Sequence, residues 1–219
     1  MNNYRGKNFI ASYSGGKDST LAIYRAIKQE MVPIELVTTY NTDRKQSWFH
    51  GIPRDLLDKI SEEIQIPITL METSGEKYTV NFEAYLKTAK EKGAEVCVFG
   101  DIDLEEHLTW CTDRCKAAGL EAYFPLWKES RKNLVYEFID SGFKTIITVV
   151  DTSRLGQEFV GRVLDRQVAE EIEKSGADIC GEDGEYHTFA YDGPLFRHSV
   201  DFAKGSVIRS DKYAIMPIF

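Results

Sequence analysis

Short apolar runs and longer amphipathic stretches alternate along the first half of the chain. Four apolar runs are typical of buried strands: residues 9–13, 33–40, 67–71 and 95–99. Apolar residues at helical spacing predict helices between these runs, over residues 21–30, 53–64 and 78–92. Crossover helices of this length suit parallel neighbours, so the alternation predicts an α/β fold with an open, mostly parallel sheet and helices on both faces.

The simple alternation ends near Pro125. Before that point we expect a helix over residues 104–118 and a short strand at 121–124. Beyond it we expect a helix over 131–141, a strand over 144–150, a helix carrying Phe159, Val163, Val168 and Ile172, and two or three strands within 199–219. We therefore predict a larger domain over residues 1–125 and a smaller C-terminal α+β domain over residues 126–219.

Polar loops follow each of the first four predicted strands. They are residues 14–19, residues 40–47, residues 73–75 and the pair Gly100-Asp101. Ligands bind outside the carboxyl ends of the strands in open α/β sheets, so we expect these loops to converge on one rim. The order of the strands stays open at this stage.

The first of these loops has the composition of an anion site. It reads Ser-Gly-Gly-Lys-Asp-Ser over residues 14–19, between an apolar run and the start of a helix. Adjacent glycines let the backbone turn sharply and approach phosphate oxygens, while Lys17 adds a positive charge. The spacing excludes a Walker loop and a Gly-x-Gly-x-x-Gly loop. An ordinary strand-to-helix turn, with Ser14 or Asp18 as the N-cap, is the alternative.

A second polar cluster, near the C-terminus, combines carboxylates and a histidine with glycines. It comprises Gly181, Glu182, Asp183, Gly184, Glu185, Tyr186, His187 and Thr188. The two glycines relax the backbone, so that several side chains can be aimed at one point. The carboxylates could hold magnesium beside phosphates, bind an ammonium ion or orient an amine. A solvated acidic turn is the alternative.

His107, Cys111 and Cys115 share one face of the predicted helix over residues 104–118. Their spacing could place ligands around a metal ion, with Cys180 or His187 as a fourth ligand. Packing and surface roles for the three residues are the alternative, which we prefer because no fourth ligand is evident from the sequence.

Composition narrows the range of partners and compartments. The net charge of −8 disfavours extensive contact with nucleic acid, because surfaces that bind the phosphate backbone are usually basic. No stretch approaches the ~20 apolar residues that a membrane span needs, and the polar N-terminus lacks the features of a signal peptide. We therefore expect a cytoplasmic protein whose four cysteines are reduced.

Five short motifs occur in one order between residues 9 and 196. They are residues 14–19, Gly100-Asp101-Ile102, Pro125-Leu-Trp127, residues 181–188 and Asp192-Gly-Pro-Leu-Phe196. Together they resemble the diphthine–ammonia ligase (diphthamide synthase) family of the PP-loop ATP pyrophosphatase superfamily. The second cluster is the more specific of the two main motifs. It departs mildly from the family pattern, because Asp183 stands where Gly-Glu-Gly-Gly-Glu has its second glycine.

The resemblance implies a Rossmann-like fold of the adenine nucleotide alpha hydrolase type and an ATP-dependent carbon–nitrogen ligase. ATP would adenylate the carboxylate of diphthine, a modified histidine on elongation factor 2, and release pyrophosphate. Ammonia would then displace AMP and leave an amide. The task of such an enzyme is mainly positioning and charge stabilisation, with ATP and Mg²⁺ as the expected cofactors.

The resemblance also implies a role for each motif residue. Nucleotide binding falls to Ser12, Ser14, Gly15, Gly16, Lys17, Asp18, Ser19, Gly100 and Asp101. Acceptor binding falls to Gly181, Glu182, Asp183, Gly184, Glu185, Tyr186, His187 and Thr188. Catalysis falls to Lys17, Asp18, Glu182, Glu185 and His187.

The fold leaves the acceptor open, since one PP-loop fold serves several acceptors. The expected partners are ATP, ammonium and either diphthine-bearing elongation factor 2 or a small carboxylate, and a homodimer stays open. Adenylation of tRNA and non-catalytic ATP binding are the alternatives. Because the chain ends at residue 219, the resemblance implies a minimal version without the further C-terminal domain of some eukaryotic relatives.

Overall fold

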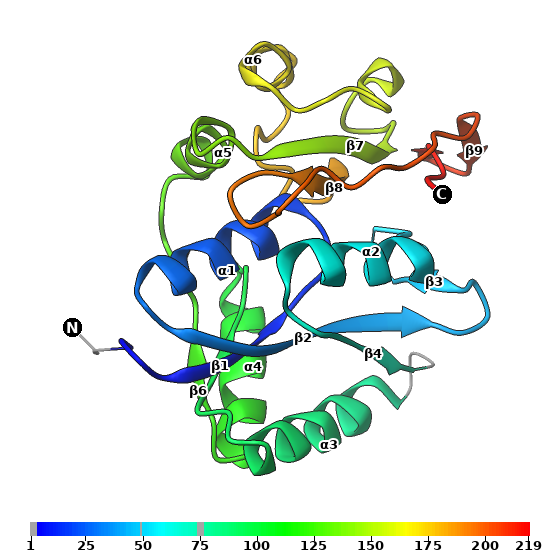
Figure 1. The fold of residues 1–219 in the computed structure, drawn as a ribbon. Helices are drawn as coiled ribbons and strands as arrows, with labels where there is room; N and C mark the ends of the chain where they lie inside the picture. Colours follow the sequence, from blue (N-terminus) through cyan, green and yellow to red (C-terminus); the bar gives the residue numbers. More distant parts are fainter. Residues whose placement is uncertain (1–3, 49, 74–76) are drawn as a thin grey trace. The chain divides into compact units, whose positions relative to one another are not determined.

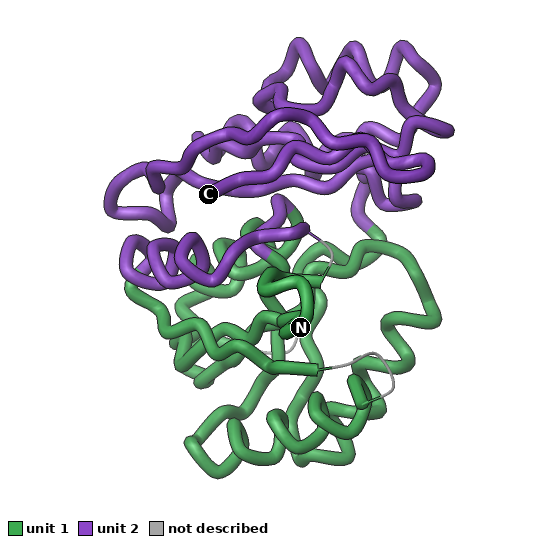
Figure 2. The backbone as a smooth tube through the Cα atoms, turned by 90° about the vertical axis from the view of Figure 1, so that its right-hand side faces the viewer, with its two compact units in different colours: residues 1–14, 18–48, 65–128 green, residues 15–17, 49–64, 129–219 purple. Residues whose placement is uncertain are grey.

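The computed structural model describes residues 4–48, 50–73 and 77–219. These residues group into two compact units, which Figure 2 shows in separate colours. Unit 1 comprises residues 1–14, 18–48 and 65–128, and unit 2 comprises residues 15–17, 49–64 and 129–219. The centre of the loop over residues 14–19 therefore groups with unit 2, while its two flanks group with unit 1. We retain the sequence domains 1–125 and 126–219 as a proposal.

Unit 1 is built on sheet A, a six-stranded sheet in which all pairings are parallel except that of a short terminal hairpin. The strand order is β3-β2-β1-β5-β6, and β4 also pairs with β2. The strands are β1 (Asn8–Ser12), β2 (Val32–Asn41), β3 (Gln46–Ser47), β4 (Ile68–Glu72), β5 (Val96–Val98) and β6 (Glu121–Tyr123).

Helices cover both faces of sheet A (Figure 1). On one face lie α3 (Tyr78–Glu91) and α4 (Glu105–Ala117), whose side chains join alternate strand residues such as Ile10 and Cys97 in a buried cluster. On the other face lies α1 (Lys17–Lys28). The chain runs outward from β1 through α1 to β2 and later enters β5 on the other side of β1. Right-handed crossovers in opposite directions place the helices on opposite faces.

Unit 2 is built on sheet B, a four-stranded antiparallel sheet in the order β8-β7-β10-β9. Its strands are β7 (Lys144–Asp151), β8 (Tyr186–Asp192), β9 (Ile208–Ser210) and β10 (Tyr213–Ile215). Its helical elements are α2 (Arg54–Ile64), α5 (Arg131–Asp140), the 3₁₀ turn η2 (Gln157–Phe159) and α6 (Arg166–Lys174). Apolar side chains such as Phe138, Phe143 and Phe189 are buried in this unit, and the first two rings stack 4.8 Å apart.

The predicted fold class is confirmed, and most predicted elements agree with the structure to within one or two residues. The single helix predicted to carry both Phe159 and Ile172 is wrong. Asp165 caps α6 by accepting a hydrogen bond from Val168 N at 2.8 Å, so the helix starts at residue 166. The segment before it runs beside β7, where Val163 forms a bridge with Ile146.

The sequence analysis also missed regular structure in two polar segments. The loop over residues 40–47 contains β3, and the second polar cluster leads directly into β8 at Tyr186. Ser74 and Gly75, which were expected at the rim, lie outside the described residues. Across the described ranges, no helix combines the length and apolar character needed to cross a bilayer.

Candidate functional site

The carboxyl end of β1 marks the point in unit 1 where the strand order changes direction. Strand β1 pairs with β2 on one side and with β5 on the other, and Ser12 is its last residue. In open α/β sheets, this switch point is the position outside the carboxyl ends where ligands bind. The flanks of the predicted anion loop and the Gly100-Asp101 pair both follow strands at this point.

Two serine hydroxyls hold the flanks of the loop together. The Ser14 N–H donates to Ser19 Oγ at 3.3 Å, and the two Oγ atoms lie 3.1 Å apart. Gly100 packs against the same turn: a Cβ at this position would lie 2.8 Å from Ser19 N and 2.9 Å from the carbonyl carbon of Asp18. Only glycine allows the chain after β5 to approach the start of α1 this closely.

Asp101 follows Gly100 directly, and part of its carboxylate already has a partner. One of its carboxylate oxygens lies 2.9 Å from His107 Nδ1 on α4. The His107 ring is therefore directed at Asp101, and Cys111 and Cys115 are buried. Burial raises the pKa of the Cys111 thiol. The packing role preferred for Cys111 and Cys115 is in keeping with their burial and stays a prediction.

In unit 2, the centre of the loop runs along the edge of sheet B. Strand β8 is at one end of the sheet order, so its outer backbone groups need partners other than β7. Ala190 N donates to Gly15 O at 2.9 Å, and Lys17 N donates to Thr188 Oγ1 at 3.1 Å. The two motifs that the sequence separates by about 170 residues are thus hydrogen-bonded within one compact unit.

Both loop glycines have close side-chain neighbours. Gly15 has φ +81°, and a Cβ there would lie 2.1 Å from Ile52 Cδ1. A Cβ on Gly16 would lie 2.3 Å from His50 Cε1. A larger residue at either position would displace the loop from β8 or displace its neighbours.

Lys17 carries its charge into a largely buried position. The residue is 5% exposed, and Nζ lies 5.3 Å from the centroid of the Tyr186 ring. The Tyr186 hydroxyl donates to Ile179 O at 2.6 Å, which fixes the ring. The face of an aromatic ring attracts an ammonium group, so this contact stabilises the charged form of Lys17.

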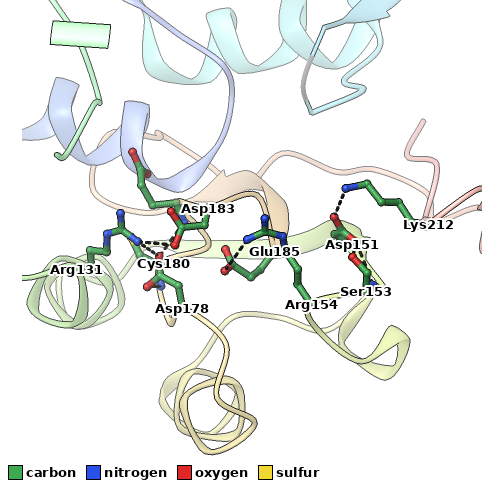
Figure 3. A network of polar contacts seen from close by, with 10 residues as sticks. Arg131, Asp151, Ser153, Arg154, Asp178, Cys180, Asp183, Glu185 and Lys212 are labelled. Atoms are coloured by element: carbon green, nitrogen blue, oxygen red, sulfur yellow. Dashed lines mark hydrogen bonds and ion pairs between the residues drawn. The ribbon is translucent and has the colours of Figure 1, made fainter. Parts of the chain in front are cut away.

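The second polar cluster begins with a tight turn and continues into β8. Gly181 and Gly184 have φ +70° and +87°, and Gly184 N donates to Gly181 O at 3.1 Å. A Cβ on Gly181 would lie 2.8 Å from the Tyr186 ring. The turn thus places three carboxylates close together: Asp178, Asp183 and Glu185 each offer an oxygen within 4.8 Å of the others (Figure 3).

Most of this carboxylate group serves to hold the turn. Arg131 Nη1 lies 2.8 Å from Asp178 and 3.2 Å from Asp183 (Figure 3). Asp178 also accepts from the backbone N–H groups of Cys180 and Glu182, at 3.0 Å each. Asp178 therefore has a structural role that includes fixing the backbone at Glu182.

Glu185 is in a different position. The residue is 5% exposed, and its Oε1 lies 3.9 Å from Arg154 Nη1, which is longer than a hydrogen bond. Its Oε2 is buried and has no hydrogen-bond partner in the described part of the chain. A buried carboxylate oxygen without a donor is costly, so a ligand that donates a hydrogen bond would be favoured there.

Three residues of this region were missed in the sequence analysis: His50, Arg131 and Asp178. The position of Asp178, three residues before a glycine turn, is a signal that could have extended the second cluster. His50 and Arg131 have no such signal, because only the folded chain brings them to the motifs.

Two family models match nearly the whole chain. They are described as the diphthamide synthase N-terminal domain, over residues 7–122, and the diphthamide synthase C-terminal domain, over residues 130–216. A Rattus norvegicus protein named diphthine–ammonia ligase is 27% identical, and the alignment covers 93% of this chain and 86% of that protein. A Danio rerio protein of the same name is 26% identical, with 92% and 89% covered.

The Bos taurus protein of the same name is 32% identical over 108 residues, which are 48% of this chain and 40% of the relative. This alignment therefore spans less than half of either protein. One solved structure, titled as a predicted subunit of tRNA methyltransferase from Methanocaldococcus jannaschii, has 13% identity and a TM-score of 0.47. It covers 86% of this chain and 98% of its own, a weak likeness that bears on no residue of the site.

Proposed function

Because the chain belongs to the diphthamide synthase family, we propose that it is an ATP-dependent ligase that joins ammonia to a carboxylate. The proposed acceptor is diphthine on elongation factor 2, in keeping with the name of its relatives. The observation that carries the proposal is the pair of hydrogen bonds that join Gly15 and Lys17 to β8, the strand that continues the second polar cluster.

The reaction proposed has two steps. A carboxylate oxygen of the acceptor attacks the α-phosphorus of ATP, the bond between the α- and β-phosphates breaks, and pyrophosphate leaves. Ammonia then attacks the acyl carbon, AMP leaves with the bonding electrons, and the nitrogen loses a proton. A carboxylate is a poor electrophile, and adenylation supplies the good leaving group that amide formation needs.

We assign the phosphates of ATP to the loop over residues 14–19. Lys17 supplies the positive charge, the hydroxyls of Ser14 and Ser19 supply donors, and the helix start at Lys17 supplies a favourable dipole. Gly15 and Gly16 leave their backbone N–H groups without a neighbouring Cβ, which is what close approach of a phosphate needs. These groups would stabilise the charge of the departing pyrophosphate.

Magnesium usually binds ATP with one or two carboxylates and completes its shell with phosphates and water. Asp101 fits this need in part, because His107 holds one of its two carboxylate oxygens. When bound, the ion would neutralise phosphate charge. Asp18, in the first turn of α1, is kept among the nucleotide-binding residues.

We assign the nitrogen side to the second polar cluster. Glu185 is the strongest candidate, because its buried Oε2 would accept a hydrogen bond from ammonium or from the attacking amine. Its carboxylate can also take the proton that the nitrogen loses. Glu182 and His187 flank it in the sequence and are proposed to contact the acceptor.

The test is a nucleotide product assay with purified protein, ammonium and diphthine-bearing elongation factor 2. We expect AMP and pyrophosphate to form only when both are present, and Lys17→Ala to abolish the reaction. Lys174→Ala is the matched control, since this lysine is exposed on α6 and pairs with Glu170, one helical turn before it. ADP as the only nucleotide product would contradict the proposal. AMP formation with a small carboxylate or tRNA instead would retain the chemistry and change the acceptor.

A further inference from the structure

His50 makes a short contact with the main chain of β8. Its Nδ1 lies 2.6 Å from Thr188 O, and both residues belong to unit 2. A carbonyl oxygen only accepts, so Nδ1 carries the proton and donates it. In a neutral ring this leaves Nε2 unprotonated.

The same ring supports the centre of the loop. A Cβ on Gly16 would lie 2.3 Å from His50 Cε1 and 3.0 Å from Nδ1, so the ring fills the space beside Gly16. The His187 ring lies 5.1 Å away, between ring centroids. His50 therefore touches both motifs, although the sequence analysis assigned it to neither.

His50 provides this contact without adding charge. Burial, together with the nearby positive groups of His187 and Lys17, lowers the pKa of His50 to about 3, against the opposing effect of the hydrogen bond to Thr188. The ring is therefore neutral at physiological pH.

We propose that His50 is a positioning residue that sets the place of the loop on β8. Thr188 is held from two sides: His50 donates to its carbonyl oxygen, and Lys17 N donates to its hydroxyl. Through Thr188 and through its contact with Gly16, the ring fixes the backbone of Gly16 and Lys17, which are assigned to the phosphates. The inference deepens the proposed function and rests on its assignment of ATP phosphates to this loop.

The experiment compares three substitutions by ATP affinity, measured by calorimetry without turnover. His50→Asn keeps an N–H donor at the δ position, whereas His50→Gln moves the donor one bond further out and His50→Ala removes it. We expect the Gln and Ala variants to lose on the order of 10-fold in ATP affinity, the worth of one hydrogen bond, and the Asn variant to recover most of it. His198→Asn is the matched control, because His198 is exposed and pairs with Glu63 in the same unit.

A purely structural role would lower the melting temperature of all three variants alike, so the rescue by Asn over Gln is the decisive result. Equal affinity of the Asn and Gln variants, or unchanged affinity of the Ala variant, would overturn the inference. We also expect the affinity ratio of wild type to His50→Asn to stay constant between pH 5 and 8, because the ring stays neutral. A ratio that rose toward pH 5 would indicate a charged histidine that binds phosphate directly, and would also overturn it.

Two further results separate this inference from the proposed function. ATP binding with the expected variant pattern, but without amide formation, would reject the proposed reaction and leave the role of His50 intact. Amide formation by the wild type, together with unchanged ATP affinity of the His50→Ala variant, would support the proposed reaction and reject the role of His50. A wild-type protein that binds no ATP would overturn the reaction and the role of His50 together. If the variants fail to fold, nitrogen NMR of the wild-type histidines still decides, since the inference requires His50 to be protonated on Nδ1 and not on Nε2.

Discussion

The flanks of the loop over residues 14–19 and its centre are held by different kinds of contact. The flanks, in unit 1, are joined by Ser14 and Ser19, which are five residues apart, and are packed by Gly100. The centre, in unit 2, is held by β8, and the bond from Lys17 N to Thr188 spans 171 positions. The comparison shows that one short motif combines a local turn with a distant strand edge.

The difference has a physical basis. Hydroxyls near a helix start can satisfy one another within a few residues, so the two serines of the flanks pair locally, while Gly100 contributes packing. Strand β8 is an edge strand whose outer backbone groups need partners beyond the sheet, and the loop supplies one of them, because Gly15 O accepts from Ala190 N. Damage to the flanks and damage to the centre should therefore have distinguishable effects.

The largest effect is expected from Gly100→Ala, which attacks the flanks. The new Cβ would lie 2.8 Å from a backbone atom, and backbone cannot yield as a flexible side chain can. We expect a loss of about 3 kcal/mol in the free energy of unfolding, the upper end for overpacking. Chemical denaturation measures this, with Ala118→Gly as a comparison for a change outside the site. A loss below about 1 kcal/mol would contradict such tight packing.

The second prediction concerns the stability of the sheet where the end of β7 meets the start of β8, and the expected change depends on pH. Burial would raise the pKa of Asp151, but hydrogen bonds from Lys212 and Ser153 outweigh it and lower the pKa to about 2. At pH values above its unfolded pKa near 4, the ionised carboxylate therefore adds about 2 kcal/mol to the free energy of unfolding. This stabilisation is lost as the pH falls through the folded pKa of about 2. Asp151 N also donates to Glu185 O at 2.8 Å.

The measurement compares the unfolding free energy of wild type and Asp151→Asn from pH 7 to pH 2. We expect the difference between them to shrink as the pH falls, because only the wild type loses the ionised carboxylate. Asp201→Asn serves as the control at an exposed position of the same unit. A difference that is constant with pH would show that the charge of Asp151 is not what stabilises this end of the sheet.

The third effect tests the centre alone. Thr188→Val keeps the shape of the side chain but removes the acceptor of the hydrogen bond from Lys17 N. We expect the free energy of unfolding to fall by about 1–2 kcal/mol and the loop to be held less firmly against β8. Thr188→Ser retains the hydroxyl and is the matched control. Unfolding and ATP affinity should both change in the Val variant. Equal behaviour of the two variants would show that the hydrogen bond is not formed.

The smallest effect is expected from Ser19→Ala, which removes the hydroxyl that joins the flanks. We expect a loss of about 1 kcal/mol in stability, since the neighbouring hydroxyl of Ser14 can turn to water. The bond from Lys17 N to Thr188 should persist, as hydrogen exchange at Lys17 would show. Faster exchange at Lys17 would mean that the flanks and the centre are not independent.

Sheet A was predictable because its strands are short apolar runs, separated by segments whose apolar residues recur at helical spacing. Sheet B was harder, since β8 begins inside a segment of glycine and acid that has no strand pattern before Tyr186. The helix wrongly predicted to start near Phe159 arose because apolar spacing cannot show that a later residue, Asp165, is the N-cap at which the helix begins. Within the candidate site, the motif residues were evident, but Asp178, Arg131 and His50 were not.

The sequence by itself determined the fold class and the motifs of this protein: the alternation that makes an α/β sheet, a glycine turn with lysine and serine, and a glycine-acid cluster. These signals lie within a few residues of one another, where local backbone and side-chain preferences act. Tertiary structure alone decided that Gly15 and Lys17 rest on the edge of β8 and that His50 fills the space beside Gly16. Contacts between residues far apart in the sequence depend on how the whole chain packs and satisfies its buried polar groups, which no local pattern records.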